Sequence, residues 1–350
     1  MCRNHMVRAL IFVLLLGSLR VASQTPPPPP ATDNSIPASS FESAAELAAK
    51  GRLDQAMAQL DQLATQTPEP SGVERLRGII LYQKQSFDGA IGAFSKAADQ
   101  DPSDRESIEM HGVSLFRMGR VQEAIPFLEK AHASVESTNV DPNYVLALCY
   151  ADVQRYDDSR RAFAAQFGFA PDSAEAHLLA ARMFLRREFR EPAGREATKA
   201  LELQPNLPLA HELLGEVALA HGDSAGAIRE LEAEQKTDPL NPDTYDRLGD
   251  AYLRKGDYAQ AQAALDRAVL LEPTATGPYI LLGETFLKMN DPIQALHYLD
   301  HAAKMDPSNF ITHNLLGQAY KAVGQQAAAM REFKLAVDLQ DPDPQNPPAK

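Results

Sequence analysis

The sequence predicts an all-α solenoid of stacked helix-turn-helix units, and three observations support this fold class. Its features return at a step of 34 residues, so that adding 34 to Gly249 and Leu265 gives Gly283 and Leu299. Prolines close successive copies at the same step. The chain has no Trp and only 7% aromatic residues, so its core is built mainly from Ala and Leu. Such a core suits closely packed helices, and an internal period of this length indicates a repeat array.

Residues 1–23 have the three parts of a secretory signal peptide. Basic residues precede the apolar run 9–16, and small residues precede a cleavage point near Ser23. This run is too short for a stable membrane span, which needs about 20 apolar residues. We therefore expect a cleaved leader and an exported protein, periplasmic or secreted, with no integral membrane span after processing. The alternative is an uncleaved N-terminal membrane anchor.

Residues 24–36 are predicted to form a Pro-rich disordered spacer. Five consecutive prolines favour the extended polyproline II conformation, and the segment has no apolar side chains to bury in a core. A ligand for a proline-binding domain is the less favoured interpretation. At the other end, residues 344–350 are predicted to be a disordered tail.

Nine repeat units occupy residues 37–343. The closing prolines keep one period throughout if a single residue is inserted near Asn139. The predicted units are then 37–70, 71–104, 105–138, 140–173, 174–207, 208–241, 242–275, 276–309 and 310–343.

The unit 242–275 shows why each copy should fold as two helices. Apolar residues recur at helical spacing over 245–253 and again over 258–269. Gly256 lies between them and ends the first helix, because glycine readily adopts the left-handed conformation. Pro273 marks the end of the second helix.

The repeated pattern resembles the tetratricopeptide repeat, a helix-turn-helix unit of 34 residues. In the clearest unit it is carried by Tyr245, Leu248, Gly249, Tyr252, Ala261, Leu265, Ala268 and Pro273. The resemblance covers residues 37–343 and implies a right-handed superhelix. In this family the first helices line a concave groove that commonly holds peptides or partner proteins. Three units carry His177, His211 or His313 at the Tyr245 position, where we expect an aromatic packing residue.

The composition argues against several other functions. A formal net charge of -13 disfavours nucleic acid or anionic lipid as the main partner, because both require neutralising cations. Only Cys149 would remain after processing, so no internal disulfide can form. His297 and His301 have a spacing that can share a metal ion, but no third ligand accompanies them. No catalytic motif is evident, and we predict a non-enzymatic protein with no catalytic residue, cofactor or metal.

The positions that the resemblance assigns to the groove fall into three groups. The later units carry an acidic ladder, which consists of Glu212, Glu216, Asp246, Asp250 and Glu284. The earlier units carry an apolar stretch, which consists of Ile79, Tyr82, Val113, Phe116, Tyr144 and Leu148. Arg182 and Arg186 lie between these groups. The alternative interpretation is that the acidic residues form an ordinary solvated face, and that Tyr82 and Phe116 pack against their neighbours.

These positions lead to a predicted function. We expect an exported scaffold or assembly factor that binds a protein or peptide with basic and apolar residues in the groove. One alternative is an accessory subunit of an envelope enzyme, secretion or polysaccharide system. Another is a glycan or small-ligand binder that uses Tyr82, Phe116 and Tyr144. Because no further helix covers the last unit, the sequence also predicts that self-association could occur there.

Overall fold

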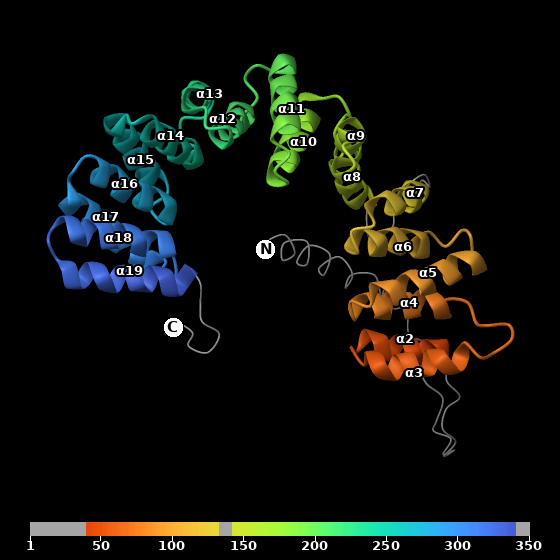
Figure 1. Cartoon of the computed structure of the whole chain (residues 1–350). Coiled ribbons are helices and arrows are strands. Elements are labelled where there is room, and N and C mark those ends of the chain that lie inside the picture. Colours follow the sequence, from red (N-terminus) through yellow and green to blue (C-terminus); the bar gives the residue numbers. More distant parts are fainter. Residues whose placement is uncertain (1–39, 133–141, 341–350) are drawn as a thin grey trace, which may run out of the picture. The chain divides into compact units, whose positions relative to one another are not determined.

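The computed structural model describes residues 40–132 and 142–340, which form eighteen helices and no strand (Figure 1). This confirms the predicted all-α class. The predicted leader, spacer and tail, and the inserted residue near Asn139, lie outside the described residues. The chain divides into two compact units, Met1–Pro171 and Asp172–Lys350, which we describe separately.

The first unit contains four helix hairpins, in which each helix packs against the next along the chain. Their helices are α2 (Phe41–Ala49) and α3 (Leu53–Leu63), α4 (Val73–Gln83) and α5 (Phe87–Gln100), α6 (Arg105–Arg117) and α7 (Val121–His132), and α8 (Pro142–Asp152) and α9 (Tyr156–Phe167).

The second unit contains five hairpins of the same kind. Their helices are α10 (Ala174–Arg186) and α11 (Arg190–Leu203), α12 (Ala210–Ala220) and α13 (Ser224–Thr237), α14 (Pro242–Lys255) and α15 (Tyr258–Leu271), α16 (Thr276–Lys288) and α17 (Pro292–Met305), and α18 (Phe310–Ala322) and α19 (Gln326–Gln340).

The turn between α14 and α15 forms as the sequence predicts. Gly256 follows the last residue of α14 with a φ of +86°, in the left-handed region that glycine tolerates best. Its N–H donates to the carbonyl of Leu253 at 3.0 Å, which satisfies one of the free carbonyls at the helix end. The chain then reverses and α15 begins at Tyr258.

A close contact between glycine and a large apolar side chain closes the hairpins. A Cβ atom added at Gly249 would lie 2.4 Å from the side chain of Leu265, which is fully buried. A Cβ atom at Gly283 would meet Leu299 at the same distance. Any larger residue at these glycines would push the two helices apart, which explains the small residues at this position of the repeat.

The histidines at the Tyr245 position do more than pack. In each case Nδ1 lies 2.6 to 3.0 Å from the carboxylate of a glutamate nineteen residues later, on the second helix of the same hairpin. The pairs are His177 with Glu196, His211 with Glu230, and His313 with Glu332. These contacts add a polar link between the two helices of a repeat.

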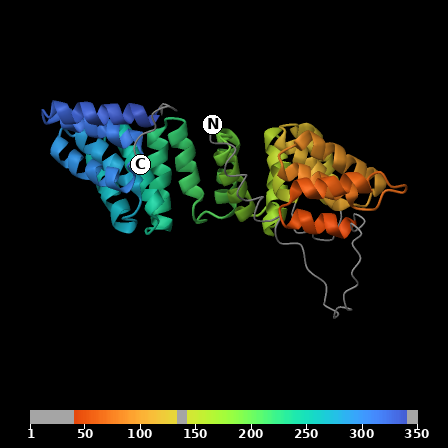
Figure 2. The ribbon, with the colours of Figure 1, turned by 90° about the horizontal axis from the view of Figure 1, so that it is seen from below.

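In the second unit the first helices contact one another from hairpin to hairpin and form a continuous layer. We call the surface of α10, α12, α14, α16 and α18 the first-helix face. Figure 2 shows the stack of this unit from a second direction, with the blue α19 at its end. Because every first helix in the layer points the same way, their N-terminal halves lie along one edge and their C-terminal halves along the other.

Candidate partner-binding face

Much of the apolar stretch of the first unit is buried. Tyr82, Val113 and Leu148 are 7%, 2% and 3% exposed. Ile79, Phe116 and Tyr144 are half-buried. The Tyr82 ring packs edge-on against Phe87 at 5.4 Å, and the Tyr144 ring packs against Phe163 at 5.8 Å. These residues therefore offer a partner less surface than their position in the repeat indicates.

Two residues of the acidic ladder, Glu212 and Glu216, lie beside an arginine that was not predicted to belong to the site. The Arg247 guanidinium pairs with Glu216 and lies 3.6 Å from Glu212 and 3.8 Å from Asp243. Arg247 follows Asp243 by four residues, a spacing at which opposite charges meet on a helix. That spacing was the available signal, whereas the contacts with α12 could only be seen in the structure.

Glu212 is buried and fastens α12 to α14. It is 7% exposed and accepts hydrogen bonds from Asn241 at 2.7 Å and from the Thr244 hydroxyl at 3.1 Å. Burial raises the pKa of the Glu212 carboxyl. This member of the ladder therefore holds two repeats together and leaves little of its side chain for a partner.

A second buried carboxylate, Glu234 on α13, was not predicted to have this role. It is fully buried and accepts from the backbone N–H groups of Leu209 at 2.7 Å and Glu212 at 3.3 Å. Leu209 precedes α12 with a φ of +69° and has no side chain that could cap the helix. Glu234 therefore supplies the missing N-terminal cap from the neighbouring helix. Its only signal in the sequence is a glutamate where most other repeats have Ala, as at Ala200 and Ala268.

Asp246 is half-buried between α14 and α16, and its carboxylate lies against Gly277. A Cβ atom added at Gly277 would be 3.7 and 3.9 Å from the two carboxylate oxygens. The Oδ1 atom is buried and has no hydrogen-bond partner within the described residues. Burial, helped by the charges of Asp243 and Asp250 and opposed by Arg247, raises the pKa of Asp246 to about 6. This carboxylate is thus poorly satisfied by its own protein.

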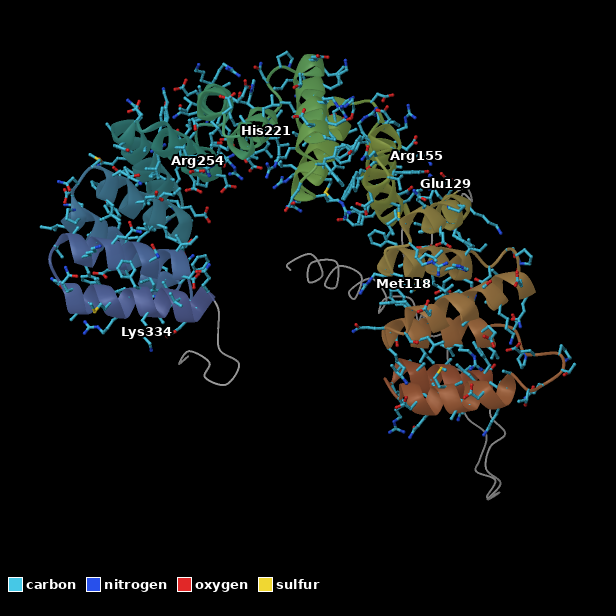
Figure 3. All side chains as sticks on the ribbon, in the orientation of Figure 1. Met118, Glu129, Arg155, His221, Arg254 and Lys334 are labelled. Carbon is cyan, nitrogen blue, oxygen red and sulfur yellow. The ribbon has the colours of Figure 1, made fainter. Side chains whose placement is uncertain are left out.

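The structure brings Asp250 and Glu284 together in one cleft of about 460 Å³ between α14 and α16. The other residues that line it are Leu253, Arg254, Lys255, Gly256, Tyr258 and Lys288. Arg254, labelled in Figure 3, pairs with Asp250 at 2.8 Å. Three cations and two carboxylates line the cleft, so this part of the face is not acidic. The cations had a signal, since Arg254 and Lys288 follow Asp250 and Glu284 by four residues.

Arg182 and Arg186 lie on α10 in the same layer and are both exposed. Among residues 172–340 neither forms an ion pair. At the far end of the unit, α19 exposes Met330 by 71% and Val337 by 64%. Self-association through this helix stays a prediction.

The other residues singled out in the sequence occupy ordinary positions. Cys149 is buried, and the ring of His301 packs against Tyr279 at 4.5 Å. Residues 40–132 and 142–340 contain no group of three or more His, Cys, Asp or Glu that could hold a metal ion. None of the helices in these ranges has the length and apolar character needed to cross a membrane.

Hairpins that stack in sequence order and present their first helices on one face define a helical-repeat protein, an architecture typical of protein–protein interaction. Family models described as tetratricopeptide repeat match residues 242–275 in one case, and residues 41–105 and 280–347 in another. A model described as anaphase-promoting complex, cyclosome, subunit 3 matches residues 83–166. The chain is a tetratricopeptide repeat protein.

Solved structures of other repeat proteins resemble the chain more distantly. Cut9 of the APC/C hetero-tetramer Cut9-Hcn1 is 17% identical, with a TM-score of 0.49 over 83% of this chain and 57% of Cut9. Yeast Tom70 is 16% identical, with a TM-score of 0.45 over 85% of this chain and 77% of Tom70. YrrB, a TPR protein with an unusual peptide-binding site, is 21% identical, with a TM-score of 0.44 over 53% of this chain and 95% of YrrB. No curated protein matches the sequence. The family assignment therefore rests on the repeat models and on the hairpins themselves.

Proposed function

We propose that the protein is a non-enzymatic scaffold that binds a protein or peptide partner on the first-helix face of residues 174–322. The observation that carries this proposal is the cleft between α14 and α16, which Asp250 and Glu284 line from two neighbouring repeats. Asp250 and Glu284 are not buried in contacts between helices, whereas Glu212 and Glu234 are. Charged groups around a cleft favour a complementary partner and suppress others.

The expected partner carries basic and apolar residues. A basic side chain would meet the half-buried Asp246, which forms no ion pair within residues 172–340. Apolar residues would meet the half-buried Leu219 and Leu287 on α12 and α16. Both contacts lie on the first-helix face of the second unit.

Export is a separate proposal and rests on the composition of residues 1–23. Cell fractionation followed by N-terminal sequencing tests it. We expect a mature chain that begins at Gln24 outside the cytoplasm. An unprocessed chain in the membrane fraction would support the alternative of an N-terminal anchor.

Selection from a displayed library of random peptides tests the binding face, because it requires no known partner. We expect the affinity of peptides selected on the full-length chain to change by about tenfold or more when Asp250 and Glu284 are both changed to Lys. The matched control changes Asp266 and Asp300 on α15 and α17 to Lys, which makes the same change in charge on second helices. Equal binding to both double variants would show that peptides bind elsewhere. Circular dichroism confirms that each variant keeps its helices.

A further inference from the structure

Two groups of charge lie at opposite ends of α14 on the first-helix face. The first, which we call the acidic cluster, consists of Glu212, Glu216, Asp243 and Asp246 around Arg247. The second, which we call the basic cleft, consists of Arg254, Lys255 and Lys288 around Asp250 and Glu284. All of these acidic residues except Asp243 belong to the single acidic ladder predicted from the sequence, but the structure separates them into two groups.

The acidic cluster has an excess of negative charge. Its four carboxylates share one guanidinium, which is engaged by Glu216 and lies 3.6 and 3.8 Å from Glu212 and Asp243. Asp246 forms no ion pair in the second unit, and its Oδ1 atom has no donor there. The four carboxylates exceed the single guanidinium by three charges, and this excess favours a cationic group on the ligand.

The basic cleft has the opposite excess. Arg254 pairs with Asp250 at 2.8 Å, so one of the two carboxylates in the cleft is already engaged. Lys255 and Lys288 are exposed and form no ion pair among residues 172–340. An ammonium group that lines a cleft without a counter-ion favours a ligand carboxylate.

The spacing of the two groups sets a length for the ligand. Asp246 and Arg254 are eight residues apart on α14, which corresponds to about 12 Å along the helix axis. An extended peptide advances about 3.3 Å per residue, so about four residues would span this distance. Basic residues in the last turn of a helix also favour the helix dipole, and this alone would explain Arg254 and Lys255 without any ligand.

Resting on the proposed function, we infer that the partner segment is zwitterionic, with a lysine or arginine beside Asp246 and an aspartate or glutamate in the basic cleft about four residues away. This assigns opposite preferences to two parts of one face. It also replaces a uniformly basic partner with a segment that carries both charges.

Four fluorescein-labelled peptides of equal length test the inference on the full-length chain by fluorescence anisotropy at low salt. One has lysine and glutamate about four residues apart, two have glutamine in place of either charge, and one has the two charges adjacent. We expect the first peptide to bind about fivefold more tightly than each of the others. Equal affinity for the paired and the singly charged peptides would overturn the inference.

A change of specificity provides the sharper test. Lys288→Glu should weaken binding of the peptide with lysine and glutamate about four residues apart by about fivefold. It should strengthen binding of a peptide in which that glutamate is replaced by lysine, because the cleft then favours a cation. Lys304→Glu makes the same change in the last turn of α17, a second helix, and should leave the order of affinities unchanged. If both variants leave that order unchanged, the basic cleft does not bind the charged residue of the peptide and the inference is wrong.

The two proposals can fail separately. Library peptides that depend on Asp250 and Glu284 but prefer a single sign of charge would support the proposed function and overturn the zwitterionic ligand. Library peptides that bind equally to the first-helix and second-helix double variants would overturn the proposed function and, with it, the inference.

Discussion

Val113 on α6 and Asp250 on α14 occupy the same position of the repeat, and the surroundings of these two residues differ. Val113 is 2% exposed, and it lies in a run of nine buried residues, 107–115, that leaves no face of this part of α6 open. On α14 six residues are buried at helical spacing, and Asp250 lies half-exposed at a cleft. The position of a residue in a repeat thus fixes where it lies on the helix but does not fix whether a partner can reach it.

The contrast directs the search for specificity to the second unit. In the first unit apolar residues at groove positions contribute to burial, as the contacts of Tyr82 and Tyr144 with phenylalanine rings show. In the second unit some charged residues at the same positions join repeats, as Glu212 does, and others, such as Asp250, lie where a partner can reach them. Three experiments test this division, in order of expected effect.

Reciprocal substitutions at the shared position should have the largest and most unequal effects. Val113→Asp places a charge where no water reaches it and should lower the free energy of unfolding by about 3 to 5 kcal/mol. Asp250→Val removes an exposed ion pair with Arg254 and should change the free energy of unfolding by less than about 1 kcal/mol. Urea unfolding followed by circular dichroism measures both. Similar losses for the two variants would remove the distinction between the units.

Removal of the buried cap should have an intermediate effect. Glu234→Ala leaves the N–H groups of Leu209 and Glu212 without an acceptor and should cost about 2 to 3 kcal/mol. Hydrogen exchange should show the loss in the first turn of α12. Glu202→Ala, which removes an exposed partner of Lys199, is the control and should leave α12 protected. Unchanged protection in the Glu234 variant would mean that water caps the helix equally well.

The smallest effect concerns pH. The folded-state pKa of Asp246 is about 6, whereas the ordinary value for an aspartate is 3.8, so the folded chain takes up a proton at a higher pH than the unfolded chain. The stability of the wild type relative to Asp246→Asn should therefore rise, by about 1 to 2 kcal/mol, as the pH falls from 7.5 to 4.5. Unfolding midpoints of both proteins across this range measure the difference. A constant difference would show that the carboxylate is solvated, and the case for an unsatisfied acceptor would weaken.

The fold could be predicted from the sequence because the residues that form the helices, the turn and the contact between the helices recur in successive units. The hairpin, its Gly256 turn and the approach of Leu265 to Gly249 all follow from spacing within one unit. The site was only partly predictable. Asp250 and Glu284 do meet in one cleft, and Arg254 could have been included from its spacing to Asp250.

The remaining site contacts join residues that the spacing within one helix does not relate. Glu234 reaches back 25 residues to Leu209, and Glu212 meets Thr244 32 residues later. The first contact depends on how the two helices of one hairpin pack, and the second depends on how one hairpin sits on the next. The burial of Val113 and Leu148 likewise depends on neighbouring helices and cannot be predicted from their position in the repeat alone.

Gly249 and Asp250 are adjacent in the sequence but serve different surfaces, and this has a consequence for the variation of the protein. Gly249 faces Leu265 inside its own hairpin, whereas Asp250 lies at the cleft shared with α16. Residues that close the hairpin and residues that meet a ligand are thus interleaved but separable. A repeat could exchange its exposed residues as a cassette, while its glycine and leucine are kept, and acquire a new partner without a new fold.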